Sequence, residues 1–351
     1  MSDTSDIAAM LTDQVGRMFR EQVDRSALSE AEAGLWPDAL WRNCADMGLT
    51  SLLVPEAAGG SDLPWRAALG LFRILGHYSV PLPVGETAIA ARLLADAGLA
   101  IPDGPLTFAI SQASDGDVLK AVPWARNSSH LVLMTRSGGL LRTDCIQLQA
   151  DAVTHHVNIA RDPRDAVKIA DLPVVQSASR AAMGGNPAML YGALLRAGQM
   201  AGALRAITAM AVDYANIRVQ FGKPIRTFQA VQQSLAQLAS EAAAADVAAM
   251  AAAAALDRGD AFFETAVAKI RTGQAAGIGS ALGHQAHGAI GFTDEHSLHY
   301  LTRRLLSWRT EYGSERYWAS KLGRRILDAD AQLWHVMTDP ALHLGDINAP
   351  A

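Results

Sequence analysis

The feature that most restricts the fold is a pair of long runs rich in alanine and leucine, at residues 187–218 and 228–258. Alanine is the best helix former and its small side chain lets helices approach closely, so both runs predict long packed helices. The second run ends in Arg258-Gly259, a cation in the last turn followed by a glycine at the expected C-terminal cap. Further helices are expected at 262–283 and 298–328. The second half of the chain is therefore predicted to be a helical bundle.

The rest of the chain changes character once. Half of the 351 residues are hydrophobic but only 6% are aromatic, which favours packed helices over a β-sandwich. Residues 1–103 repeat helical spacing with short breaks, whereas short apolar runs such as LTFAI and HLVLM follow, separated by Gly, Asp, Asn and Ser. Such runs indicate the strands of a small sheet or barrel. We expect a mainly α fold with an all-α domain at 1–103, a reduced β domain at 104–180 and a four-helix bundle at 181–351.

Charge and cysteine content exclude several classes of partner. The net charge is −5, the pI is near 6.0 and no basic stripe is present, so nucleic acid is not an expected partner. Cys44 and Cys145 cannot form a disulfide framework and fit a reducing compartment. The acidic N-terminus does not resemble a signal peptide, and no run reaches the ~18 uninterrupted apolar residues of a membrane helix. A cytoplasmic protein without membrane insertion is expected.

The break between the two long runs carries more chemistry than a turn requires. It reads NIRVQFGKPIRTFQAVQ at 216–232, with Gly222 and Pro224 forcing the turn and Thr227 as the expected N-cap of the next helix. Arg218 would lie at the end of one helix, and Gln229 in the first turn of the next, where free backbone N–H groups favour an anion. Such a corner could hold a pyrophosphate; a plain helix hairpin with a surface arginine is the other interpretation.

Three segments resemble the acyl-CoA dehydrogenase family of FAD enzymes. The run R-x-Q-F-G-K-P-I…F-Q-x-V-Q is the first, and the second, Gln285-Ala286-His287-Gly288-Ala289-Ile290-Gly291, is similar to the family's Q-x-x-G-G-x-G motif with alanine at the second glycine. The third is LWRNCADMGLTSLLVPEAAGG at 35–60, which resembles the family's N-terminal helix and following loop. The three occur in the family's order, and its α–β–α domain order agrees with the pattern above.

The resemblance implies a cofactor, a substrate and partners. In that family the arginine corner binds the FAD of a neighbouring subunit, and the Q-x-x-G-G loop contacts the adenosine and pyrophosphate half of the same flavin. It therefore implies FAD, an acyl-CoA substrate, an acceptor of the electron-transfer flavoprotein type, and a homo- or hetero-oligomer (dimer or tetramer). The residues implied for cofactor binding are Arg218, Gln220, Phe221, Phe228, Gln229, Gln285, Gly288, Ala289, Gly313 and Ser314.

The catalytic base departs from the family pattern. Many members take the α-proton with the Glu of a Y-E-G-T motif, and the matching segment here is Thr310-Glu311-Tyr312-Gly313-Ser314. Glu311 is the candidate base, although it lies one residue early, and on a helix that shift turns a side chain by about 100°. A second subgroup places its base at the start of the first bundle helix, where this chain has Gly192. The middle region also lacks the family's T-E-P-x-x-G-S-D run.

Three functions remain open at this point. The first is an FAD-dependent acyl-CoA dehydrogenase that forms a 2,3-enoyl-CoA. The second is a non-catalytic or half-site subunit that completes a partner's FAD site, because the chain resembles the shorter subunits of bacterial heteromeric acyl-CoA dehydrogenases of fatty acid or steroid side-chain catabolism. The third is another flavoenzyme on the same fold, an oxidase or monooxygenase. No metal is expected, because no cysteine accompanies the histidines near His287.

Overall fold

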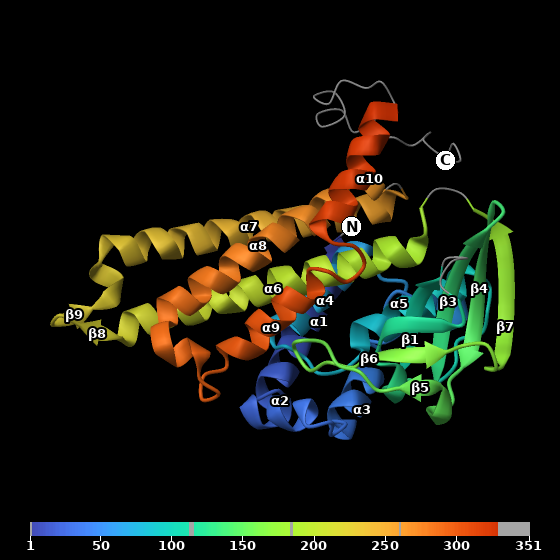
Figure 1. Ribbon diagram of the computed structural model, residues 1–351, viewed down its shortest axis with the longest axis horizontal. Coiled ribbons are helices and arrows are strands. Elements are labelled where there is room, and N and C mark those ends of the chain that lie inside the picture. Colours follow the sequence, from blue (N-terminus) through green and yellow to red (C-terminus); the bar gives the residue numbers. More distant parts are fainter. Residues whose placement is uncertain (1, 112–115, 183–184, 260, 329–351) are drawn as a thin grey trace. The chain divides into compact units, whose positions relative to one another are not determined.

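The structure, a computed structural model, describes residues 2–111, 116–182, 185–259 and 261–328. Helices come first, strands follow and long helices return, which confirms the predicted fold class (Figure 1). The helices and strands are α1 (Ser2–Gln22), α2 (Arg25–Glu32), α3 (Asp38–Asp46), α4 (Trp65–His77), α5 (Val84–Asp96), β1 (Leu106–Ser111), β2 (Val118–Pro123), β3 (His130–Ser137), β4 (Leu140–Gln147), β5 (Val153–Thr154), β6 (Arg164–Lys168), β7 (Val174–Ala181), α6 (Pro187–Ile217), β8 (Val219–Gln220), β9 (Lys223–Pro224), α7 (Gln229–Arg258), α8 (Phe262–His287), α9 (Leu298–Trp308) and α10 (Glu315–Asp328).

The chain divides into two compact units. The first comprises the described residues of 1–30, 69–80 and 193–323, and the second those of 31–68, 81–192 and 324–351. The first unit is helical apart from the short β8–β9 pair, and the second contains the two larger sheets. The domain boundaries expected near residues 103 and 180 stay predictions.

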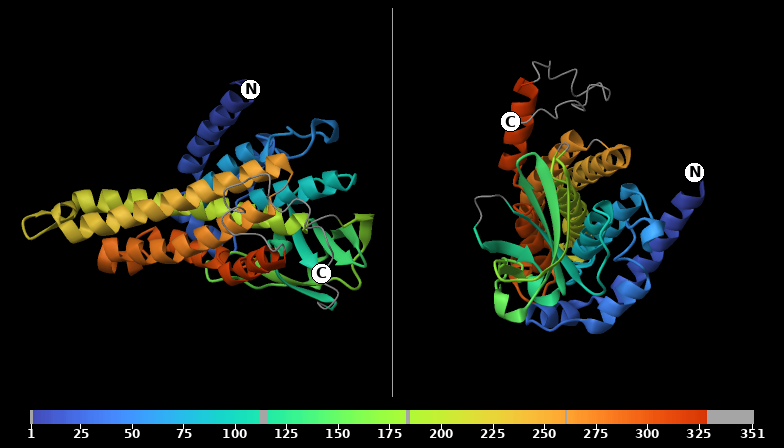
Figure 2. Two further views of the ribbon diagram at one scale, coloured as in Figure 1. Left: turned by 90° about the horizontal axis from the view of Figure 1, so that it is seen from above. Right: turned by 90° about the vertical axis from the view of Figure 1, so that its right-hand side faces the viewer.

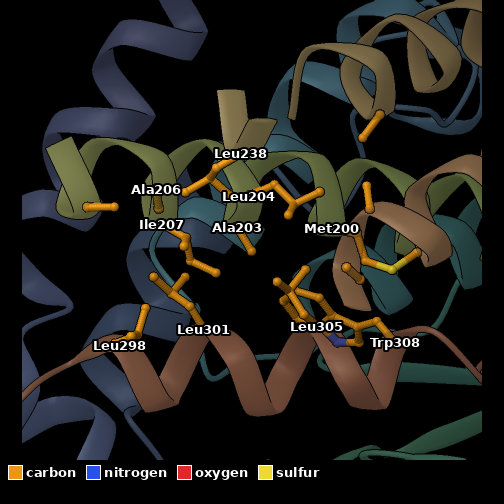
Figure 3. Packing of buried hydrophobic residues seen from close by; sticks show 14 residues of the cluster. Met200, Ala203, Leu204, Ala206, Ile207, Leu238, Leu298, Leu301, Leu305 and Trp308 are labelled. Atoms are coloured by element: carbon orange, nitrogen blue, oxygen red, sulfur yellow. The ribbon is translucent and has the colours of Figure 1, made fainter. Parts of the chain in front are cut away.

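The core of the first unit lies where α6, α7, α8 and α9 meet. Leu204 and Ile207 of α6 pack against Leu238 of α7 and Leu305 of α9, all with no exposed surface (Figure 3). Figure 2 shows α6, α7 and α8 running along one another. Small residues allow this closeness: a Cβ added at Gly202 of α6 would lie 1.9 Å from a backbone carbonyl oxygen of α4. Alanine and glycine at the contacts therefore set the helix spacing.

The second unit contains a four-stranded sheet in the order β1-β3-β4-β7 and a three-stranded sheet in the order β2-β6-β5. β1 and β3 are parallel and the other pairs are antiparallel. The run HLVLM forms most of β3, and its four apolar residues are buried on both faces of the sheet. A continuous apolar run is what a strand covered on both faces requires. The predicted strands at LTFAI and HLVLM are thereby confirmed.

The predicted boundaries of α6 and α7 agree with the structure to within one residue, but the helix predicted at 298–328 does not. Gly259 follows α7 in the left-handed conformation (φ 92°), and its N–H bonds the carbonyl of Ala255, which confirms the predicted cap. The single helix predicted at 298–328 is wrong, because Tyr312 (φ 50°) and Gly313 (φ 92°) break it into α9 and α10. Thr227 is not the N-cap of α7: it lies in a 3-10 turn, its hydroxyl bonds the carbonyl of Pro224, and α7 begins two residues later.

Within the described part of the chain, one helix has the length and apolar composition of a membrane span. This is α7, whose apolar character comes mainly from alanine and whose most apolar window is 39% buried. It packs along α8 and contributes Leu238 and Ala245 to the core of the first unit. An alanine-rich core helix passes the same test, so α7 is weak support for a membrane span.

Candidate functional site

The break between α6 and α7 is a two-residue β-hairpin. β8 and β9 pair through Gln220 and Lys223, and the two residues between them, Phe221 (φ 52°) and Gly222 (φ 77°), are both left-handed. Such a pair is typical of a type I′ hairpin turn. Glycine adopts it freely, whereas phenylalanine does so at an energetic cost. The strain falls on Phe221, which is also 91% exposed.

The hairpin presents polar and aromatic groups to solvent. Arg218, Gln220 and Gln229 are exposed, and Phe228 is half-buried. The Phe221 and Phe228 rings meet edge to face with centroids 6.0 Å apart. Lys223 Nζ lies 4.7 Å from the centre of the Phe228 ring, a cation–π contact that sequence reasoning missed. The result is a surface of two aromatic rings, with the Lys223 ammonium group against one of them.

The second predicted motif lies at the C-terminal end of α8. The helix ends at His287, and Gly288 (φ 62°, ψ −143°) then turns the chain into a short 3-10 segment. Only glycine adopts that backbone conformation without strain. A Cβ added at Gly288 would meet nothing within 4 Å, so its backbone is open to a ligand. Gln285 and Ala289, the other predicted contacts, are exposed beside it.

The structure brings these two motifs together. The backbone carbonyl of Tyr214, in the last turn of α6, accepts a hydrogen bond from the backbone N–H of Arg218 (2.9 Å). The Tyr214 ring packs on the His287 ring with centroids 5.0 Å apart. His287 immediately precedes Gly288. Figure 1 shows the hairpin and the end of α8 toward the same end of the first unit. We call the residues of the hairpin and of the Gln285–Ala289 loop the clamp.

The histidines beside the clamp lie partly or fully buried and contact one another or nearby rings. His287 Nδ1 donates to the carbonyl of Gly283 (2.7 Å), and the His287 and His296 rings lie 4.5 Å apart. Burial, with neighbouring histidines adding to it, lowers the pKa of His284 and of His296. His284 stacks on Phe292 with centroids 4.3 Å apart. Among the described residues, no group of three or more histidine, cysteine and acidic side chains is arranged to hold a metal.

Glu311 lies in the turn between α9 and α10 rather than on a helix. The rotation of about 100° that a one-residue shift causes on a helix therefore does not apply to this side chain. The turn is fixed by Trp318, whose Nε1 donates to the carbonyl of Tyr312 (2.9 Å), and a Cβ added at Gly313 would lie 2.6 Å from that Trp318 nitrogen. Ser314 caps α10, because its Oγ accepts the N–H of Tyr317 (3.3 Å). Gly313 and Ser314 thus have local structural roles.

The Glu311 carboxylate forms an ion pair with Arg196. Arg196 Nε donates to Glu311 Oε2 at 2.6 Å, and the side chains are 1% and 16% exposed. The guanidinium also donates to Gln199 Oε1 (2.6 Å) and lies 5.6 Å from the centre of the Tyr312 ring. A buried arginine needs such a partner, since an unpaired buried charge is costly. The pair fixes the orientation of the carboxylate, and sequence reasoning missed Arg196.

Glu311 and the clamp lie in different regions of the first unit. The Glu311 carbonyl is bonded by Lys269 on α8, whereas the clamp adjoins His287 on the same helix. These two positions on α8 are separated by about 27 Å at a rise of 1.5 Å per residue. One chain therefore presents the clamp and the candidate base at two separate places.

Known proteins share this fold and match most of the sequence. The model described as "Acyl-CoA dehydrogenase, N-terminal domain" matches residues 5–99, and "Acyl-CoA dehydrogenase, C-terminal domain" matches residues 186–327. Acyl-CoA dehydrogenase IpdE2 of Mycobacterium tuberculosis (strain ATCC 25618 / H37Rv) is 29% identical over 302 residues, which cover 84% of this chain and 89% of that protein.

Two solved structures extend the likeness to the fold of nearly the whole chain. A variant of the steroid ACAD Tcur3481-Tcur3483 aligns with a TM-score of 0.80 and 23% identity, covering 94% of this chain and 100% of that one. The ChsE4-ChsE5 complex from Mycobacterium tuberculosis gives a TM-score of 0.76 and 20% identity, covering 92% and 97%. The two family models together match more than half of the sequence, in the order expected from its motifs. The chain belongs to the acyl-CoA dehydrogenase family.

Proposed function

We propose that the protein is an FAD-dependent acyl-CoA dehydrogenase that converts an acyl-CoA thioester to a 2,3-enoyl-CoA. The observation that carries this proposal is the clamp: two motifs far apart in sequence meet through Tyr214 and His287 and expose an arginine, glutamines and a phenylalanine. A strained, exposed Phe221 is expensive for a hairpin that serves only as a connection. The cost is offset when the ring packs against a ligand.

The residues of the clamp fit a dinucleotide. Arg218 would supply the counter-charge for a pyrophosphate, and the first turn of α7 at Gln229 offers free backbone N–H groups. The open backbone at Gly288, with Gln285 and Ala289 beside it, would receive the adenosine half. FAD, when bound, supplies the acceptor for the hydride that leaves the β-carbon of the thioester.

Glu311 is the proposed base that removes the α-proton. Its carboxylate is fixed by Arg196, so its position is already determined before substrate arrives. The same ion pair supports the second candidate function, a half-site subunit that completes a partner's FAD site. A carboxylate that stabilises a buried arginine has a structural reason to be present without any catalytic one.

Either function requires an oligomer. The clamp and Glu311 are too far apart along α8 to serve one flavin ring and its own adenosine at once, so the clamp would act on the FAD of another subunit. The exposed apolar side chains of α7 support this: Val247 is 60% and Met250 45% exposed. We propose a dimer or tetramer, built from copies of this chain or with a related chain. A ring-bearing acyl group is proposed as substrate, because one structural neighbour is named a steroid ACAD.

The cell compartment and the electron acceptor complete the proposal. Cys44 and Cys145 are free and buried, which suits the reducing cytoplasm. An electron-transfer flavoprotein is the proposed class of acceptor, as the resemblance to the family implies. Neither assignment affects the test that follows.

The first experiment is the visible spectrum of the purified chain before and after adding a panel of acyl-CoAs without oxygen. A flavin spectrum that bleaches with one of them supports the dehydrogenase. A colourless protein that gains flavin only when expressed with a second family member supports the half-site subunit. A bound flavin that no acyl-CoA reduces would refute the dehydrogenase and favour an oxidase or monooxygenase.

Variants of the clamp test its role separately from the reaction. Arg218→Ala or Phe221→Ala should weaken FAD binding by about tenfold to a hundredfold, the size of a lost charge-assisted or aromatic contact. Ile159→Ala removes an exposed apolar side chain (60% exposed) from the second unit and is the matched control. Equal FAD content in all three variants would refute the assignment of the clamp to the cofactor.

A further inference from the structure

Lys269 is a charged residue in α8 with no exposed surface. Its Nζ donates hydrogen bonds to three backbone carbonyls, those of Trp308 (2.9 Å), Arg309 (3.3 Å) and Glu311 (2.9 Å). An ammonium group has three N–H donors, so all of them point at the end of α9 and the turn that follows. A cation at this position also complements the negative end of the α9 dipole.

The same face of α8 is shaped to receive the rest of the turn. Gly273 lies one helical turn beyond Lys269, and a Cβ there would lie 2.4 Å from Glu315 Oε1. Gly277 is one turn further, and a Cβ there would lie 3.0 Å from an Arg309 guanidinium nitrogen. Residues four apart lie on one helix face. Lys269 and the two glycines thus form one face of α8, and the segment from Arg309 to Glu315 packs against it.

Keeping a lysine at this position is expensive. Burial lowers its pKa to about 7, and of the charged groups that face it Glu311 and Glu315 raise the pKa while Arg196 and Arg309 lower it. A methionine would fill nearly the same space without a charge to desolvate, although it would leave the three carbonyls without this donor. The carbonyl contacts are the feature that methionine could not reproduce.

We propose that Lys269 is the positioning residue of the turn that carries Glu311. Its side chain, on α8, binds three backbone carbonyls and so fixes the backbone of the turn. This places the Glu311 carboxylate where it forms its ion pair with Arg196. The inference rests on the proposed function only in treating Glu311 as a reacting group. The positioning of the turn itself can be measured without any substrate.

The structural test compares Lys269→Met with Lys168→Met, which removes an exposed lysine of the second unit. At pH 7 we expect Lys269→Met to unfold at a denaturant concentration close to that of the unaltered protein, because removing a costly buried charge offsets the loss of three carbonyl contacts. Its backbone amides at the end of α9, Arg309 and Thr310, should nevertheless exchange about tenfold faster or more, because three carbonyl contacts are lost. In the native turn these amides bond the carbonyls of α9. Lys168→Met should change neither measurement.

Two results would overturn the proposal. One is unchanged exchange at Arg309 and Thr310 in Lys269→Met, which would mean that Trp318 and Arg196 hold the turn alone. The other is a lower unfolding midpoint with faster exchange throughout the first unit, or failure to fold, which would mark a general packing role. Lys269→Arg keeps a cation with several donors and should restore part of the protection; no restoration would also count against the proposal.

A kinetic test separates this inference from the proposed function. In flavin-loaded protein, Lys269→Met should slow flavin reduction by bound acyl-CoA about tenfold to a hundredfold while leaving acyl-CoA affinity unchanged, because proton removal depends on the position of Glu311 and thioester binding does not. If acyl-CoA reduces the flavin in none of the proteins but the exchange pattern is as expected, the role of Glu311 fails and that of Lys269 stands. Flavin reduction at equal rates in the unaltered protein and in Lys269→Met would refute the positioning role.

Discussion

Breaking the Arg196–Glu311 ion pair from either side should give different and strongly non-additive losses of stability. Glu311→Gln leaves a guanidinium that is 1% exposed without its counter-ion. Removing one partner of a buried pair costs about 3–5 kcal/mol. Because Glu311 is 16% exposed and glutamine still accepts a hydrogen bond, we expect a loss somewhat below that range, about 2–4 kcal/mol. Arg196→Met leaves a carboxylate with some access to water and should cost less, about 1–2 kcal/mol.

The double variant decides the matter. With Arg196→Met and Glu311→Gln together, neither member of the pair is left charged without the other, so the double variant should be more stable than the sum of the two losses by at least about 1.5 kcal/mol. The assay is chemical denaturation of the four proteins at pH 7, compared by midpoint at unchanged slope. Losses that add within about 0.5 kcal/mol would show that the two side chains do not interact in solution. The structural role of Glu311 would then be refuted, and with it the argument that Arg196 fixes the carboxylate before substrate arrives.

Three further predictions follow from single residues. Gly202→Ala places a Cβ 1.9 Å from a backbone oxygen of α4 and should lower the free energy of unfolding by about 3 kcal/mol. Gly16→Ala, with nothing within 4 Å, should raise it by about 0.5–1 kcal/mol, so the two denaturation midpoints should shift in opposite directions. As the pH rises above 7, the folded chain releases the Lys269 proton while the unfolded chain keeps it up to its ordinary pKa of about 10.5. The free energy of unfolding should therefore gain up to about 1.4 kcal/mol per pH unit from this residue, and Lys269→Met should reduce the measured slope by that amount. Burial raises the pKa of Cys44 to about 12 and of Cys145 to about 11, so a thiol reagent at pH 8 should label neither until denaturant is added, and fast labelling of native protein would contradict the buried placement.

The long helices could be predicted because their signals are local. Alanine-rich runs and the Arg258-Gly259 ending determine where α7 lies, and no distant contact is needed to recognise them. The motifs of the clamp were also identifiable from the sequence. Their meeting was not, since it depends on the ring contact between Tyr214 and His287, which neither motif specifies.

The turn between α9 and α10 shows why the rest could not be predicted. Gly313 followed by Ser314 is a local signal for a helix break and a new N-cap, and it could have corrected the helix expected at 298–328. The partners of the turn carry no such signal. Nothing in the sequence around Lys269 in α8 or Arg196 in α6 distinguishes them from the other charged residues of those helices. Only the packing of α8 and α6 in the first unit shows which groups they bind.

The first unit is assembled from segments at both ends of the chain, and this determines when it can form during synthesis. Phe19 of α1 and Phe72 of α4 have no exposed surface in the folded protein. The unit to which they belong extends to Gly323. At 5–20 residues per second, the roughly 240 residues after Val80 take on the order of 12 to 50 s to emerge from the ribosome. For that time the apolar faces of α1 and α4 have no native partner from the C-terminal half. The newly made chain is therefore a natural client for a chaperone until its last helices arrive.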